Sequence, residues 1–316
     1  MRRLSLLLLV SAMACSSATR MAPPREPYVV VLGIAQDGGY PQAGCRRDDC
    51  VARFEGKAEG ESVASLGIVD PVSGQRWLLD ATPDFPRQLH RLEHLAGAPL
   101  AGALPLDGVL LTHAHIGHYL GLSHLGREVL NARGVPVFAM PRMRAFLENN
   151  GPWSQLVSLK NIDLRTLQDG IPVALNERIS VTPLLVPHRD EFSETVGFIV
   201  RGPARAILWL PDIDKWEKWT TSIESVVAQV DVAYVDATFA SAAELPGRDL
   251  REIPHPTVDE TTARFATSPL RSRIRFIHLN QSNPLLREAS LRRALHARGF
   301  AVAVEGEIVS LGNGKP

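Results

Sequence analysis

The chain has 316 residues, of which 45% are hydrophobic and 22% are charged, and this is the composition of a folded globular protein rather than of a disordered or fibrous one. Its 34 basic side chains balance its 34 acidic ones, so it lacks the strong basic field of a general nucleic-acid-binding protein. We therefore expect a small molecule as its substrate and no nucleic acid as a partner.

The N-terminus has the pattern of an export signal, which we assign to residues 1–15. A basic start precedes a short apolar core, Leu4 to Val10, which is too short to span a bilayer as a permanent helix. Cys15 follows several small residues, and the segment resembles a bacterial lipoprotein signal with Cys15 as the lipidated residue. Ala12 departs from that pattern, because a large aliphatic residue is usual there, and simple cleavage near Cys15 is the alternative. We expect an exported protein, either periplasmic or anchored to the membrane as a lipoprotein.

Residues 16–27 are polar and proline-rich, and we expect them to form a flexible tether to a single folded domain over residues 28–316. That domain opens with a predicted strand and a glycine-rich loop, which contains Asp37 and is followed by Cys45 and Cys50. In an oxidising compartment two cysteines this close in sequence could form a disulfide. They could also supply half of a small structural metal site.

Strand-like and helix-like segments alternate along the rest of the chain. The predicted strands are Tyr28–Ile34, Ser62–Val69, Arg76–Asp80, Gly108–Thr112, Val135–Ala139, Asp163–Thr166, Ile171–Leu175, Ile179–Val186, Thr195–Val200, Ala206–Leu210, Val232–Asp236 and Arg275–Leu279. The predicted helices are Asp84–Leu95, Tyr119–Arg133, one that a capping box opens at Thr257 and that ends near Ala266, and Arg287–Arg298. This order favours two sheets packed together with helices outside.

Three histidines, His113, His115 and His118, lie within six residues directly after the apolar run Gly108–Thr112. Imidazole nitrogens are good ligands for zinc and its neighbours, and the end of a strand is where an α/β fold displays its chemistry. His113 and His115 are two positions apart in an extended segment, so both side chains can lean toward one point. His118 enters the next turn and approaches from another side.

Four isolated polar residues each follow an apolar strand at its C-terminal end, and they are Asp80, His188, Asp212 and His278. Any one of them could be a cap, a turn residue or a satisfied core side chain. Together with the histidine cluster they predict a metal site.

The order Asp, HxHxxH, His, Asp, His resembles the metallo-β-lactamase superfamily. The resemblance implies an α/β fold of the αββα type, a four-layer sandwich of two mixed β-sheets with helices outside and a metal site at one edge. It also implies zinc, as one or two ions, with iron or manganese as alternatives. By this resemblance His113, His115 and His188 hold the first ion, and His118 and His278 hold the second. Asp212 bridges the two ions. Asp80 orients the segment over residues 113–118, which we call the histidine loop.

One position departs from the superfamily motif HxHxDH, because Gly117 stands where the motif has aspartate. Glycine offers no ligand, so the second ion loses a carboxylate. Asp37 lies in the glycine-rich loop after the first strand and could replace it, or it could simply shape the turn beside Gly38.

A closer resemblance is to the pyrroloquinoline quinone biosynthesis protein B branch, PqqB-like proteins, and it is carried by the stretches 32–42, 235–239 and 276–284 together with Cys45. The cysteine cluster of that branch binds a structural metal, and only Cys45 and Cys50 of it are present here. A biosynthetic enzyme would be expected in the cytoplasm, so the export signal favours a different role for this chain.

Three functions are compatible with these observations. The first is a metal-dependent hydrolase that acts on an ester, lactone or phosphodiester, with Asp212 holding the attacking water and His278 stabilising the leaving oxygen. The second is a PqqB-like, iron-dependent oxidative enzyme or a related factor of cofactor synthesis. The third is a non-catalytic exported protein that binds a metal or ligand. We expect His255 and Asn280 beside the substrate.

Overall fold

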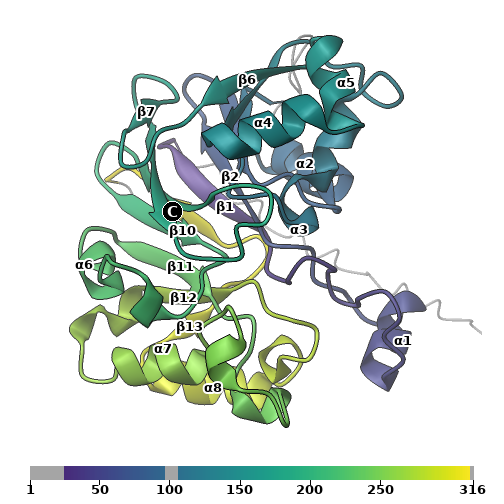
Figure 1. Ribbon diagram of the computed structural model, residues 1–316. Helices are drawn as coiled ribbons and strands as arrows, with labels where there is room; N and C mark the ends of the chain where they lie inside the picture. The colour runs from purple at the N-terminus through teal and green to yellow at the C-terminus, as the bar shows by residue number, and fades with distance from the viewer. Residues whose placement is uncertain (1–24, 97–105, 314–316) are drawn as a thin grey trace, which may run out of the picture.

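The computed structural model describes residues 25–96 and 106–313 (Figure 1). The export signal with Cys15 and most of the predicted tether lie outside the described residues. Within the part of the chain that is described, no helix is both long and apolar enough to cross a membrane.

The described residues build two seven-stranded sheets. The first sheet has the order β14-β1-β2-β3-β4-β5-β6 and the second the order β13-β12-β11-β10-β9-β8-β7. The strands of the first sheet are β1 (Tyr28–Gly33), β2 (Ser65–Asp70), β3 (Gln75–Leu79), β4 (Gly108–Leu110), β5 (Val135–Ala139), β6 (Ile162–Thr166) and β14 (Ile308–Ser310). Those of the second are β7 (Val173–Ala174), β8 (Ser180–Val186), β9 (Thr195–Arg201), β10 (Ala206–Leu210), β11 (Val232–Asp236), β12 (Ile274–Ile277) and β13 (Ala301–Val302).

Both sheets are mixed, and the parallel strands in each sheet determine where the functional side chains lie. Strands β3 to β6 pair in parallel in the first sheet, and β10 to β13 pair in parallel in the second. The carboxyl ends of parallel strands meet at one edge of a sheet, where the connecting loops carry functional residues. The polar residues that follow these strands are therefore collected at one edge.

The alternation of apolar side chains along the strands produces two cores. In β1, Val29 and Val31 join the larger core, which also contains Trp77 and Trp209, whereas Val30 joins the core under the helices of the first sheet. Side chains two apart on a strand face the same side, so a continuous apolar run can serve both faces.

Helices cover the outer faces of the two sheets (Figure 1). The first sheet is covered by α2 (Phe85–Ala96), α3 (Ile116–Tyr119), α4 (Pro141–Asn149) and α5 (Trp153–Ser158), and the second by α6 (Ile223–Val227), α7 (Val258–Arg264) and α8 (Ala289–Ala297). The predicted α/β four-layer sandwich is confirmed. The predicted capping box at Thr257 is also confirmed, because its side chain accepts from the Glu260 backbone and the Glu260 side chain accepts from Thr257.

A short helix, α1 (Asp48–Phe54), stands apart from the layers and holds one half of a disulfide (Figure 1). Cys45 and Cys50 form this bond, so neither thiol is free to bind a metal. Arg47 connects the segment to the body of the protein by donating to the backbone oxygen of Gln281 at 2.8 Å.

The prediction of one helix over Tyr119–Arg133 was wrong. The α-helix α3 ends at Tyr119, a 3-10 helix runs from Leu120 to Leu125, and turns follow. Gly121 is pressed against the neighbouring loop, since a β-carbon there would lie 2.3 Å from the backbone oxygen of Thr82. Asn131 has φ of 44°, a left-handed value that a helix cannot contain. Packing against Thr82 outweighs the local preference for a helix.

We predict that Gly121→Ala destabilises the protein by about 1–3 kcal/mol, because the added methyl group overpacks a site bounded by backbone atoms. Urea unfolding followed by circular dichroism measures the change. Gly151→Ala is the matched control, since a β-carbon at Gly151 meets no atom within 4 Å. Equal midpoints for the two variants would show that the loop at Thr82 yields to the methyl group.

Candidate metal centre

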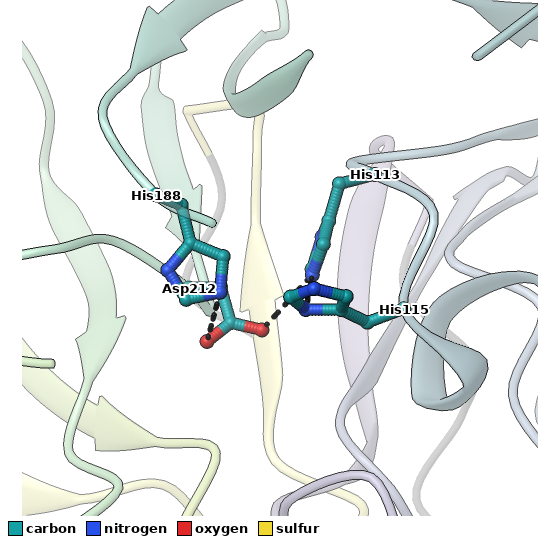
Figure 2. Close-up of side chains that lie close together, drawn as sticks. All are labelled: His113, His115, His188 and Asp212. Atoms are coloured by element: carbon teal, nitrogen blue, oxygen red, sulfur yellow. Dashed lines mark hydrogen bonds and ion pairs between the residues drawn. The ribbon is translucent and has the colours of Figure 1, made fainter. Parts of the chain in front are cut away.

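Histidine and aspartate side chains from both sheets converge at the strand ends. Figure 2 shows His113, His115, His188 and Asp212 directed into a common space. Their candidate ligand atoms all lie within 4.8 Å of one another. Segments that are far apart in the sequence supply them, because the first two histidines follow β4 whereas His188 follows β8 and Asp212 follows β10.

The two histidines of the HxH pair present different ring nitrogens to this space. His113 Nε2 lies 2.8 Å from His115 Nδ1, so these two atoms point to one place. His115 Nε2 turns away and lies 3.1 Å from a carboxylate oxygen of Glu191. Glu191, which the sequence did not single out, can therefore fix the orientation of the His115 ring.

Asp212 is the shared member of the cluster. Its Oδ2 lies 3.3 Å from His113 Nε2, 3.1 Å from His118 Nε2 and 3.3 Å from His278 Nε2, and its Oδ1 lies 3.7 Å from His188 Nε2. Ligand atoms about 2.0–2.1 Å from a tetrahedral zinc ion are roughly 3.3 Å from each other. The spacing around Asp212 therefore suits atoms that bind one or two such ions.

A second group of candidate ligands consists of Asp37, His118 and His278. Asp37 Oδ1 lies 3.5 Å from His118 Nε2 and 3.9 Å from His278 Nε2. The loop after β1 thus delivers a carboxylate to the two histidines that the superfamily resemblance assigns to a second ion.

Several of these buried polar atoms lack any hydrogen bond among the described residues. They are Asp37 Oδ1, His118 Nε2, His188 Nδ1 and Nε2, Asp212 Oδ1 and His278 Nε2. Buried polar atoms are almost always paired, so a group of unpaired ones that face each other calls for a partner. Imidazole nitrogen and carboxylate oxygen are the donor atoms that zinc and iron take. The residues present therefore fit a transition-metal site.

The histidine loop is oriented by Asp80 and Thr112. Asp80 Oδ2 lies 2.9 Å from His118 Nδ1, and Asp80 Oδ1 accepts from the Thr112 backbone at 2.8 Å and from the Thr112 hydroxyl at 2.9 Å. The same hydroxyl lies 3.0 Å from His113 Nδ1. These bonds fix the rings so that both Nε2 atoms face the cluster.

A matching arrangement supports the other side, through Asp236 and Thr238. Asp236 Oδ1 accepts from the Thr238 hydroxyl at 2.8 Å, and this hydroxyl lies 3.0 Å from His278 Nδ1. Asp236 Oδ2 lies 2.8 Å from His255 Nδ1, which also lies 3.3 Å from Asp212 Oδ1. Asp236 had no predicted role, although it ends an apolar strand just as Asp80 follows one.

Two of the strand ends hold a backbone conformation that non-glycine residues rarely adopt. Asp80 has φ of 67° and His278 has φ of 61°. Such conformations persist where the surrounding structure enforces them, and they concentrate at functional sites. Both residues end strands at the cluster, so the strain occurs where side chains are aimed at the candidate metal position.

Electrostatics keeps His113, His188 and Asp212 in forms that bind cations. Burial alone would lower the pKa of His118, but the carboxylates around it outweigh burial and raise that pKa well above its usual value. Burial lowers the pKa of His188 to about 4, and burial together with His118 lowers the pKa of His113 well below its usual value. Burial alone would raise the pKa of Asp212, but the surrounding histidines together outweigh burial and hold that pKa well below its usual range. His113 and His188 are therefore neutral and Asp212 is ionised near neutral pH.

The two other residues that were predicted to lie beside the substrate, His255 and Asn280, differ in their contacts with the cluster. His255 belongs to it, since Asp212, His255 and His278 form a third group of candidate ligand atoms. Asn280 bonds to its neighbours instead, because its amide donates to Gln36 and its oxygen accepts from Ser282. Asn280 thus holds the loop after β12 against the loop after β1.

Comparison with known proteins identifies the family. The family model described as the beta-lactamase superfamily domain matches residues 75–279 of this chain. The chain belongs to this superfamily. It is 27% identical to the coenzyme PQQ synthesis protein B of Methylorubrum populi over 311 residues, which cover 90% of this chain and 100% of that protein. The predicted resemblance to the superfamily and to its PqqB-like branch is confirmed.

Solved structures share the fold. Zn(2+)-bound PqqB from Methylobacterium extorquens superposes with a TM-score of 0.75 at 23% identity, over 90% of this chain and all of the other. A diphosphatase from the PhnP family superposes with a TM-score of 0.62 at 19% identity, over 90% of this chain and 96% of the other. At these identities the likeness shows the fold alone.

We predict that Asp80→Asn weakens zinc binding by about 10–100-fold, because a neutral amide makes a weaker hydrogen bond to His118 Nδ1 than the carboxylate does and so orients the ring less firmly. Asparagine tolerates positive φ, so the backbone at this position is kept. Competition with a chromophoric chelator measures the affinity. Asp163→Asn, on an exposed part of β6, is the control. Unchanged affinity in Asp80→Asn would remove Asp80 from the supporting role.

Proposed function

We propose that the protein is a metal-dependent hydrolase that cleaves an ester, lactone or phosphodiester bond in a small molecule. The observation that carries the proposal is the position of Asp212 between two groups of buried histidines. A divalent cation held by His113, His115 and His188 would supply Lewis acidity and lower the pKa of a bound water to about 7. A structural neighbour in the same fold is a diphosphatase, which supports a hydrolytic reaction.

Asp212 and His255 are the residues of the chain placed to orient the attacking water and to move a proton. Asp212 is buried, with 2% of its side chain exposed, and its pKa is held low, so it is ionised and its carboxylate can accept a hydrogen bond from the attacking water and hold that water in place. His255 lies beside it, and Asp236 fixes its ring through Nδ1. His255 is thus positioned to give a proton to the leaving group.

A second candidate function is an oxidative reaction of the PqqB type, and the match to coenzyme PQQ synthesis protein B over its whole length favours it. Imidazole and carboxylate ligands also suit iron. A non-catalytic binding role is the third. Metal analysis of protein purified without added metal separates the first two, because a hydrolase of this kind is expected with zinc or manganese and the oxidative enzyme with iron.

The hydrolase proposal predicts turnover by protein that has been stripped with a chelator and reloaded with zinc. Bis(4-nitrophenyl) phosphate, 4-nitrophenyl acetate and a simple lactone represent the three substrate classes. We expect at least one to be cleaved, and we expect His188→Ala to abolish the reaction together with zinc at the first site. Zinc-loaded protein that cleaves none of them would contradict the proposal and favour the binding role.

The role of His255 is tested separately. We predict that His255→Ala lowers kcat by about 10²–10⁴-fold with zinc content unchanged, because a proton donor is lost and the ligands remain. His296→Ala, an exposed histidine on α8, is the matched control. A loss of zinc in His255→Ala would instead make His255 a metal ligand.

We further propose that the protein is exported and that Cys15 carries a lipid anchor. The basic and apolar start of the chain supports this proposal, as does the Cys45–Cys50 disulfide, because such bonds persist in oxidising compartments. We expect Cys15→Ser to move the protein from the membrane fraction to the soluble fraction of the producing cell. Palmitate labelling of the two forms provides the direct measurement, and an unlabelled wild-type protein would exclude the anchor.

A further inference from the structure

Gly117 lies in a space that leaves no room for a side chain. A β-carbon built at Gly117 would lie 2.1 Å from Asp37 Oδ1, 2.7 Å from Asp37 Cα and 2.9 Å from Asp37 Cγ. Non-bonded carbon and oxygen atoms do not approach so closely without displacement. All three nearest atoms belong to one residue, so Asp37 occupies the volume that the side chain of the superfamily motif would fill.

The Asp37 carboxylate also has the surroundings of a ligand. Its Oδ1 is buried, makes no hydrogen bond to any described residue, and lies 3.5 Å from His118 Nε2 and 3.9 Å from His278 Nε2. Both ring nitrogens are buried and likewise lack hydrogen bonds within the described chain. The two imidazoles face Asp37 Oδ1 at distances slightly longer than the roughly 3.3 Å that separates ligand atoms of one tetrahedral zinc ion.

Backbone bonds fix Asp37 in this position. The Gln36 N–H donates to the Leu279 carbonyl at 2.9 Å, and the Gly39 N–H donates to the Gln36 carbonyl at 2.7 Å. Ala35 forms isolated β-bridges to Val63 and to Leu279. Since Leu279 directly follows His278, the loop that carries Asp37 is attached to the segment that carries one of its partner ligands.

We infer that Asp37 is the carboxylate ligand of a second cation, and that Gly117 is glycine because Asp37 has taken its place. The ligand has moved from the histidine loop to the loop after β1, while the position of the carboxylate in space is kept. The second site then consists of Asp37, His118, His278 and the shared Asp212, and its donor set suits zinc, iron or manganese. This inference concerns metal binding and holds whether or not the bound protein is a hydrolase.

The test is zinc stoichiometry and affinity, measured by isothermal titration and by elemental analysis after desalting. We expect the wild-type protein to bind two equivalents of zinc. Asp37→Asn, which keeps the size of the side chain, should bind one equivalent tightly and the second at least about tenfold more weakly, since even supporting residues around a metal contribute 10–100-fold. Asp48→Asn, an exposed change of the same kind on α1, should bind as the wild type does.

Gly117→Ala provides a second, independent test of the position of Asp37. Its methyl group should displace the Asp37 carboxylate, so this variant should lose the second equivalent although no ligand has been removed. The double variant Asp37→Asn/Gly117→Ala should be no worse at the second site than the weaker single variant, because both changes act on one interaction. Circular dichroism checks the fold, and Asp37→Asn alone decides the question if Gly117→Ala does not fold.

Two results would overturn the inference. One is a wild-type protein that holds a single equivalent at saturating zinc. The other is an Asp37→Asn variant that binds two equivalents with wild-type affinities, which would leave Asp37 as a residue that only shapes the turn. Turnover enters neither measurement, so a failure of the proposed reaction leaves this result interpretable.

Discussion

The structure depends on the contact between the buried Asp212 carboxylate and the histidines that surround it. Asp212 follows β10 in the second sheet, while His113 and His118 follow β4 in the first. An isolated carboxylate is very costly to bury, and it is tolerated here because imidazole nitrogens lie 3.1–3.3 Å from one of its oxygens. The contact therefore joins the edges of the two sheets and sets the place where any ion would be held.

Both sheets support this contact in the same way. In each, an aspartate at a strand end binds a threonine hydroxyl that in turn lies against a histidine, through Asp80 and Thr112 on one side and Asp236 and Thr238 on the other. Each aspartate also holds a second ring, which is His118 in the first sheet and His255 in the second. The orientation of the candidate ligands is thus fixed by hydrogen bonds on the side of each ring away from the candidate metal position, which is a general requirement of metal sites.

The sequence contained the fold class and most of the cluster, because polar residues that end apolar strands are visible without a structure. Asp80, His188, Asp212 and His278 were found in this way, and the structure brings them together. Thr112 and Thr238 could not be found, since a threonine after an apolar run has no distinguishing feature until its partner is placed beside it. The helix expected over Tyr119–Arg133 failed for the same reason, because the close packing of Gly121 against Thr82 joins segments that the local pattern treats separately.

The absence of an aspartate directly before His118 bears on how relatives of this chain are recognised. A search that requires the unbroken HxHxDH string rejects the chain, although a carboxylate oxygen lies 3.5 Å from the ring of His118. Gly117, which stands where the motif has aspartate, and Asp37, which brings a carboxylate to the same place, are 80 positions apart in the sequence. If such proteins were classified by this sequence motif alone, their metal centre would be counted as incomplete. The donor atoms of that centre can nevertheless all be present in three dimensions.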